Sequence, residues 1–103
     1  MKRRSYNVRL LRAAEQDLTE AVMYVMAESP AAAQALAERM EKQLALLSGQ
    51  PLMGKTPGDA KLAGMGYRYI VVKNYLVFYT VEENDVLVHR IIHGARDYLN
   101  ILQ

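Results

Sequence analysis

Residues 66–98 constrain this chain most, because they predict three short strands with almost nothing between them. β-Branched and aromatic residues dominate the stretch, and polar turn-forming residues interrupt it at two places. The predicted strands cover residues 67–73, 75–81 and 86–93. Connections this short join only antiparallel neighbours, since a parallel crossover takes about a dozen residues or more. We therefore expect a three-stranded antiparallel meander.

The chain before the meander changes its hydrophobic period. Residues 5–10 alternate apolar and polar side chains, which is typical of a half-buried strand. From about Leu11 apolar residues recur at helical spacing as far as Ser29-Pro30, where serine suits an N-cap and proline suits the first position of a new helix. The second helix is expected over residues 30–48. Two helices joined this closely form an antiparallel hairpin.

The remaining segment, residues 49–66, holds five of the six glycines and shows no periodicity, so it is expected to be a loop. The order of strand, helical hairpin, loop and meander predicts a two-layer α+β fold, with one domain over residues 1–103. Both helices should lie on one face of a four-stranded sheet. The opposite face is then expected to be free.

Composition narrows the functional classes. The absence of cysteine excludes disulfides and thiolate metal sites. No apolar run approaches the ~18 residues of a membrane span, and no apolar segment follows the basic N-terminus as a signal peptide requires. We therefore expect a cytoplasmic protein with no membrane partner. A net charge of +2 and a pI of 9.0 fit either scattered surface charge or a patch that faces phosphate.

Three residues could carry chemistry: Arg68 early in the meander, His93 at its end, and Arg96 just beyond. Arginine offers a planar, permanently charged fork that suits phosphate, and histidine exchanges protons near neutral pH. Two arginines beside a histidine could hold an RNA phosphodiester while the 2′-hydroxyl attacks it, without metal or cofactor. We find no common catalytic or cofactor motif in the chain.

Each of these residues also has a purely structural interpretation. Arg68 could pair with Asp59 or with a helix carboxylate. His93 could be a hydrogen-bonded residue at a strand end, and Arg96 could form a surface ion pair with Asp97.

Strand parity makes a further prediction about the last strand. In a regular strand, alternate residues point to the same face. His89 should therefore share the face of His93, and Arg90 should point the other way. The tyrosines of the meander could stack on bases, although tyrosines in strands usually pack.

Several short segments follow one another along nearly the whole chain, in an order more specific than any one of them. They are Ala14-x-x-Asp17-Leu18, Tyr24, Leu47 leading into Pro51 and Gly54, GYR at 66–68, NYLVFY at 74–79 and RIIHGARD at 90–97. In this order they resemble the RelE/ParE superfamily, the toxins of type II toxin–antitoxin modules. The resemblance implies an antitoxin partner whose C-terminal region wraps the toxin as helix and strand.

The resemblance also implies one of two activities. RelE-like toxins cleave mRNA in the ribosomal A site without metal, and ParE-like toxins inhibit DNA gyrase. The first implies that Arg68, His93 and Arg96 are catalytic and that RNA binds at the lysines and tyrosine Lys55, Lys61 and Tyr98. No glutamate matches the general base of some relatives. We expect the ribosome-dependent endoribonuclease, with mRNA and the ribosome as partners; the alternatives are a gyrase inhibitor without nuclease activity, or an inactive module that only binds its antitoxin.

Overall fold

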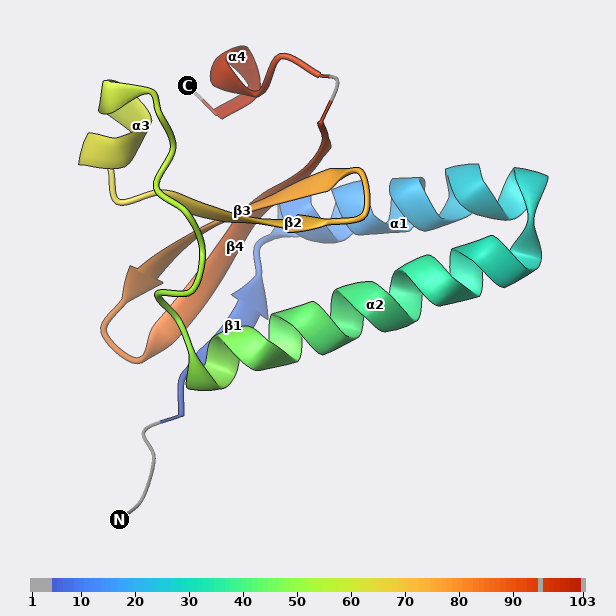
Figure 1. Ribbon diagram of the computed structural model, residues 1–103, viewed down its shortest axis with the longest axis horizontal. Coiled ribbons are helices and arrows are strands. Elements are labelled where there is room, and N and C mark those ends of the chain that lie inside the picture. Colours follow the sequence, from blue (N-terminus) through green and yellow to red (C-terminus); the bar gives the residue numbers. More distant parts are fainter. Residues whose placement is uncertain (1–4, 95, 103) are drawn as a thin grey trace.

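The structure, a computed structural model, describes residues 5–94 and 96–102. A four-stranded sheet lies between a long helical hairpin and two short helices (Figure 1). In chain order the elements are β1 (Asn7–Leu10), α1 (Arg12–Glu28), α2 (Pro30–Gly49), α3 (Ala60–Gly64), β2 (Arg68–Val72), β3 (Tyr75–Glu82), β4 (Asp85–His93) and α4 (Tyr98–Leu102). No helix in the described part of the chain is long and apolar enough to cross a bilayer.

The sheet has the order β1-β4-β3-β2, and the predicted meander of β2, β3 and β4 is confirmed as antiparallel. β1 pairs with β4 in parallel, from Asn7 opposite Asp85 to Leu10 opposite Val88. This pairing is possible because the whole helical hairpin lies between the two strands in sequence and supplies the long crossover that parallel neighbours need. The predicted α+β architecture is thereby confirmed.

The helical hairpin forms as the sequence predicts. The hydroxyl of Ser29 accepts a hydrogen bond from the amide of Ala32 at 3.1 Å, and Pro30 occupies the first turn of α2. The two helices and one face of the sheet enclose the main core, to which Met40, Leu44 and Leu47 of α2 contribute. Figure 1 shows the far end of the hairpin extending beyond the sheet.

The opposite face of the sheet is covered, so the expectation of a free face is wrong. A second core cluster joins Leu62 of α3 and Leu102 of α4 to Phe78 and Ile92 of the sheet. Residues 49–66 are also not a plain loop, since Asp59 caps α3 by accepting from the amide of Leu62 at 3.0 Å. Both helices have only five residues, and a pattern this short carries no helical period to detect.

β4 contains an irregularity that reverses the predicted orientation of one histidine. Tyr79 pairs with Val88 and the next residue back, Phe78, pairs with Arg90, so His89 is one extra residue in β4. His89 contacts Tyr67, which belongs to the cluster under α3 and α4. The prediction that His89 shares the face of His93 is therefore wrong, because parity counting fails across a bulge.

Candidate functional site

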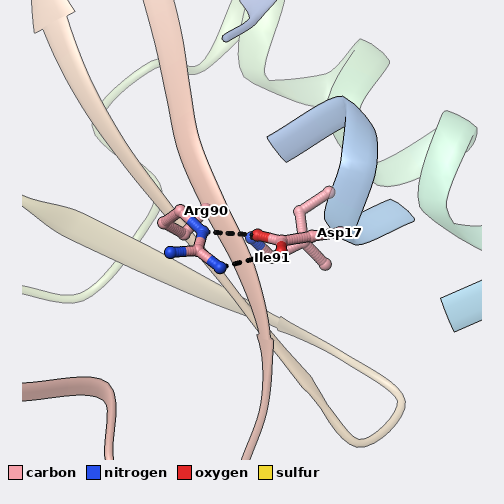
Figure 2. A network of polar contacts seen from close by, with 3 residues as sticks. All are labelled: Asp17, Arg90 and Ile91. Atoms are coloured by element: carbon pink, nitrogen blue, oxygen red, sulfur yellow. Dashed lines mark hydrogen bonds and ion pairs between the residues drawn. The ribbon is translucent and has the colours of Figure 1, made fainter. Parts of the chain in front are cut away.

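Asp17 of α1 ties the helical hairpin to the part of β4 that β1 does not reach (Figure 2). Its carboxylate accepts from the amide of Ile91 at 2.9 Å and from Nε and Nη2 of Arg90 at 2.7 and 2.9 Å. The hydrogen bond to Asp17 raises the pKa of Arg90 above its ordinary value, because it stabilises the charged guanidinium. The carboxylate of Asp17 thus accepts the hydrogen bond from the Ile91 amide that a neighbouring strand would otherwise accept.

An open groove lies beside this link, and we call it the His93 groove. It has a volume of about 440 Å³, and its lining residues are Asp17, Glu20, Ala21, Tyr24, Tyr75, Ile91, His93 and Arg96. The amide of Arg96 donates to the carbonyl of His93 at 2.9 Å, and this turn places the two side chains in one groove. The ring of Tyr75 meets that of His93 edge-on at 5.4 Å.

The His93 groove has mixed charge. Arg96 faces a wall that includes the carboxylates Asp17 and Glu20. Asp17 is hydrogen-bonded to Arg90, and the charge of Glu20 also helps to raise the pKa of Arg90, so both carboxylates of the groove interact with that guanidinium. Tyr24 adds an exposed aromatic ring, 71% accessible, at the rim. The groove can therefore receive a polar ligand, but its acids oppose a highly anionic one.

Arg68 belongs to a different structure, which we call the Arg68 clasp. The clasp consists of Arg68, Tyr79 and the loop residues 51–54. Arg68 Nη1 donates to the carbonyl of Gly54 at 3.0 Å and, at 3.4 Å, to that of Leu52. The buried hydroxyl of Tyr79 donates to the carbonyl of Pro51 at 2.8 Å and accepts from the amide of Gly54 at 2.9 Å. The clasp fixes the loop that follows α2 against the sheet.

The clasp leaves no space at Gly54. A Cβ added there would lie 2.5 Å from the hydroxyl of Tyr79 and 2.8 Å from the carbonyl oxygen of Tyr69. Burial raises the pKa of Tyr79, while the Gly54 hydrogen bond and the charge of Arg68 oppose that rise. The phenol therefore stays protonated and can donate, as the bond to Pro51 requires.

The structure does not bring Arg68 to His93. Arg68 is opposite Tyr79 and His93 is opposite Tyr75, so they differ by four positions along β3 and lie on strands that flank it. At strand spacings of about 3.3 Å along and 4.8 Å across the sheet, their Cα atoms are roughly 16 Å apart. Both also lie on the face that carries the hairpin, because Tyr79 and Tyr75 pack on the main core. The expected convergence on a free face is wrong.

The other residues predicted to bind RNA lie outside the His93 groove. The backbone of Lys55 pairs with Tyr69 at the outer edge of β2, and Lys61 is exposed on α3. Tyr98 begins α4 and packs on Phe78, with ring centroids 5.2 Å apart, on the opposite face of the sheet. Among the described residues, the structure therefore unites His93 with Arg96 alone of the predicted set.

The structural alternatives for these residues have specific outcomes. Asp59 caps α3, and Arg68 instead donates to loop carbonyls. Asp97 accepts from Asn100 Nδ2 at 2.6 Å, and within the described residues it forms no ion pair with Arg96. Sequence reasoning did not assign a role to Asp17 or Arg90, although both stand in the segments that carried the resemblance.

On the opposite face, His89 lies in a smaller polar site. Its Nε2 is 2.9 Å from the hydroxyl of Thr80, which donates to Glu82 at 3.2 Å. A hydroxyl has one proton to donate, so this arrangement requires a proton on His89 Nε2. Burial lowers the pKa of His89, and the carboxylate of Glu82 partly offsets that effect. Across the described residues, no group of three or more His, Cys, Asp or Glu side chains gathers as metal ligands would.

A helical hairpin over one face of a mixed four-stranded sheet, with short helices on the other face, defines the class of small RelE/ParE-like toxins. The sequence profile described as "ParE toxin of type II toxin-antitoxin system, parDE" matches residues 8–98. The chain belongs to this ParE toxin family.

Solved structures agree with that assignment. The chain is similar to one in the chromosomal ParDE toxin–antitoxin system from P. aeruginosa, with 17% identity and a TM-score of 0.70 over 87% of this chain and 97% of the other. It is also similar to one in the toxin–antitoxin complex RelBE2 from Mycobacterium tuberculosis, with 25% identity and a TM-score of 0.59 over 86% and 98%. No curated protein sequence matches the chain significantly.

Proposed function

We propose that this toxin acts by binding and that its target is DNA gyrase in the cytoplasm, with no nuclease chemistry. The observation that supports this is the separation of Arg68 from His93 and Arg96. Arg68 Nη1 donates to the carbonyls of Leu52 and Gly54, and this position away from His93 argues against a two-arginine phosphate site beside an imidazole. A toxin that inhibits by binding needs no such site. Membership of the ParE family supports the same choice.

The test is a supercoiling assay with purified gyrase. Wild-type toxin should inhibit supercoiling in a dose-dependent manner, and His93→Ala should inhibit equally well, because the proposal involves no proton transfer. Full supercoiling at a large excess of folded toxin would overturn the proposal. Circular dichroism of each sample establishes that the protein is folded.

A ribosome-dependent endoribonuclease is the second candidate, and one observation favours it: His93 and Arg96 line the same open groove. In that case one arginine and the imidazole act on the phosphodiester, and Arg68 supports the fold from a distance. Programmed ribosomes incubated with the toxin should then yield cut mRNA, and His93→Ala or Arg96→Ala should abolish the cut. Intact mRNA would remove this candidate. Inactivity in both assays, with unchanged growth on expression without antitoxin, would indicate an inactive module.

We propose that the cognate antitoxin covers the outside of the helical hairpin. An apolar groove of about 490 Å³ runs between α1 and α2, with the lining residues Leu18, Thr19, Val22, Met23, Ala37, Glu41 and Leu44. Met23 is 65% exposed, and an exposed apolar groove of this kind fits one face of an amphipathic helix. The two similar structures are both from toxin–antitoxin systems.

Copurification tests this contact with a matched pair of variants. Met23→Glu places a charge in the apolar groove and should weaken copurification with the antitoxin. Met65→Glu makes the same change at a similarly exposed methionine beyond α3 and should copurify normally. Equal retention of both variants would exclude the groove as the antitoxin site.

A further inference from the structure

The side of α2 that faces the β2–β3 turn carries a compact group of cations, which we call the α2 basic patch. It surrounds a hollow of about 410 Å³ whose lining residues are Ala35, Glu38, Arg39, Lys42, Gln43 and Lys73. Arg39 and Lys42 are one helical turn apart on α2, and Lys73 reaches the hollow from the turn between β2 and β3. Figure 1 shows this turn directed toward the side of the helical hairpin.

The three cations of the patch are not neutralised within the described part of the chain. The ion pairs found there join Arg9 to Asp85 and Arg90 to Asp17, and none involves Arg39, Lys42 or Lys73. The single carboxylate of the hollow, Glu38, accepts a hydrogen bond from Gln34 at 3.2 Å. Three positive charges therefore share one hollow with one negative charge. That arrangement is stable in solution only because the side chains are exposed to water.

The lining of the patch indicates what class of ligand it suits. Its uncharged members are Ala35 and Gln43, and no large apolar side chain is among its lining residues. A protein partner needs an apolar anchor at the centre of the interface, which the groove between α1 and α2 offers and the patch does not. Nucleic-acid interfaces are instead polar and strongly cationic, and a phosphate backbone is recognised by such residues without an apolar core.

We infer that the α2 basic patch binds the phosphate backbone of duplex DNA. Duplex DNA carries one negative charge per about 1.7 Å of its axis, so three cations around one hollow meet several phosphates at once. The choice of DNA over RNA depends on the proposed function, since a toxin bound to gyrase meets duplex DNA. The contact would be independent of sequence as far as it is made to phosphate oxygens, because these position a protein on the duplex without reading its bases.

Binding of the free toxin to a fluorescent duplex, measured by anisotropy over a range of salt concentrations, tests this inference without gyrase. Each phosphate contact contributes about −0.9 to the slope of log Kobs against log salt, so Arg39→Gln/Lys42→Gln should reduce the magnitude of the slope by about 1.8. Lys73→Asn should reduce the magnitude of the slope by about 0.9. Asparagine is chosen because it tolerates the left-handed backbone at residue 73, where φ is 56°. The change in slope is diagnostic, since other cations contribute equally to all variants.

The control removes the same charge from the other side of the molecule. Arg9→Gln/Arg12→Gln deletes two cations at the end of β1 and the start of α1 and should leave the slope unchanged. Equal losses in the two double variants would overturn the inference, because only net charge would then matter. So would tighter patch-dependent binding to duplex RNA or to a poly-glutamate peptide than to DNA.

The DNA assay and the supercoiling assay fail independently. DNA binding through the patch, without inhibition of gyrase, would remove the proposed target and leave the patch assigned. Inhibition of gyrase by a toxin that shows no salt-dependent DNA binding would do the reverse.

Discussion

The hairpin-bearing face of the sheet has two polar ends, and they differ in how far their side chains are exposed. At the Arg68 clasp, Tyr79 is buried, and its hydroxyl, the amide of Gly54 and Nη1 of Arg68 all have partners inside the protein. At the His93 groove, His93 and Arg96 are exposed around an open volume of about 440 Å³. A cation whose donors are used internally contributes to stability, whereas an exposed one can meet a ligand. The comparison therefore assigns the clasp to the fold, whereas the groove is accessible from solvent.

The largest loss of stability is expected from Gly54→Ala, which places a methyl group at the centre of the Arg68 clasp. The new methyl group would meet the hydroxyl of Tyr79 at 2.5 Å and a backbone oxygen at 2.8 Å, so the loop must move and its hydrogen bonds must break. We expect a loss of about 3 kcal/mol in the free energy of unfolding, measured by urea denaturation. Gly49→Ala is the control: nothing lies within 4 Å of its new methyl group, and stability should be unchanged or rise by up to about 1 kcal/mol.

A somewhat smaller loss is expected from Asp17→Ala, beside the His93 groove. This change leaves the Ile91 amide and the guanidinium of Arg90 without their shared acceptor. The side chains of Arg90 and Asp17 are 27% and 11% exposed, so water restores part of the loss and about 2 kcal/mol is expected. Arg9→Ala, which breaks a 3.9 Å pair whose arginine is 66% exposed, should cost less than about 0.5 kcal/mol. Equal costs for the two variants would contradict this account of the groove wall.

The two ends are compared most directly by Arg68→Ala and His93→Ala. Arg68→Ala should lower the free energy of unfolding by about 1 kcal/mol and speed proteolysis within residues 50–58, because the loop loses its charged donor. His93→Ala should stay within about 0.5 kcal/mol of wild type, as is usual for an exposed side chain. A larger loss for His93→Ala than for Arg68→Ala would reverse the assignment of the two ends.

The smallest effect is expected in the pH dependence of the free energy of unfolding, and it comes from His89. Burial lowers the folded-state pKa of His89 below its ordinary value of 6.5, so the unfolded chain takes up this proton first as pH falls. Stability is then fully present above pH 6.5 and declines as the pH falls from there toward the lowered pKa. His89→Asn should flatten this part of the stability curve. Identical curves for wild type and His89→Asn would contradict this interpretation.

Much of the fold could be predicted from the sequence, because its signals are local. The boundary between the two long helices at Ser29-Pro30 could be predicted, because an N-cap serine and a first-turn proline affect only the few residues next to them. The meander was visible because short turns allow only antiparallel strands. The five-residue helices were not detectable, since a helix that short is unstable by itself and forms where its few apolar side chains meet the sheet.

The candidate site could be predicted only in part. The pairing of His93 with Arg96 followed from three residues of separation, and the structure places both in one groove. Arg68 was wrongly joined to them, because alternation along a strand predicts a face but not a position along the sheet. Asp17 was assigned no role because its partners lie in β4, more than 70 residues further along the chain.

The sequence by itself determined the order and kind of the main elements and the family to which they belong, because those depend on local preference and on the order of short segments. Tertiary structure alone decided which polar groups form contacts within the fold and which are exposed on its surface. The physical reason is that contacts between segments distant in the sequence depend on strand register and on the bulge at His89, which set which segments meet.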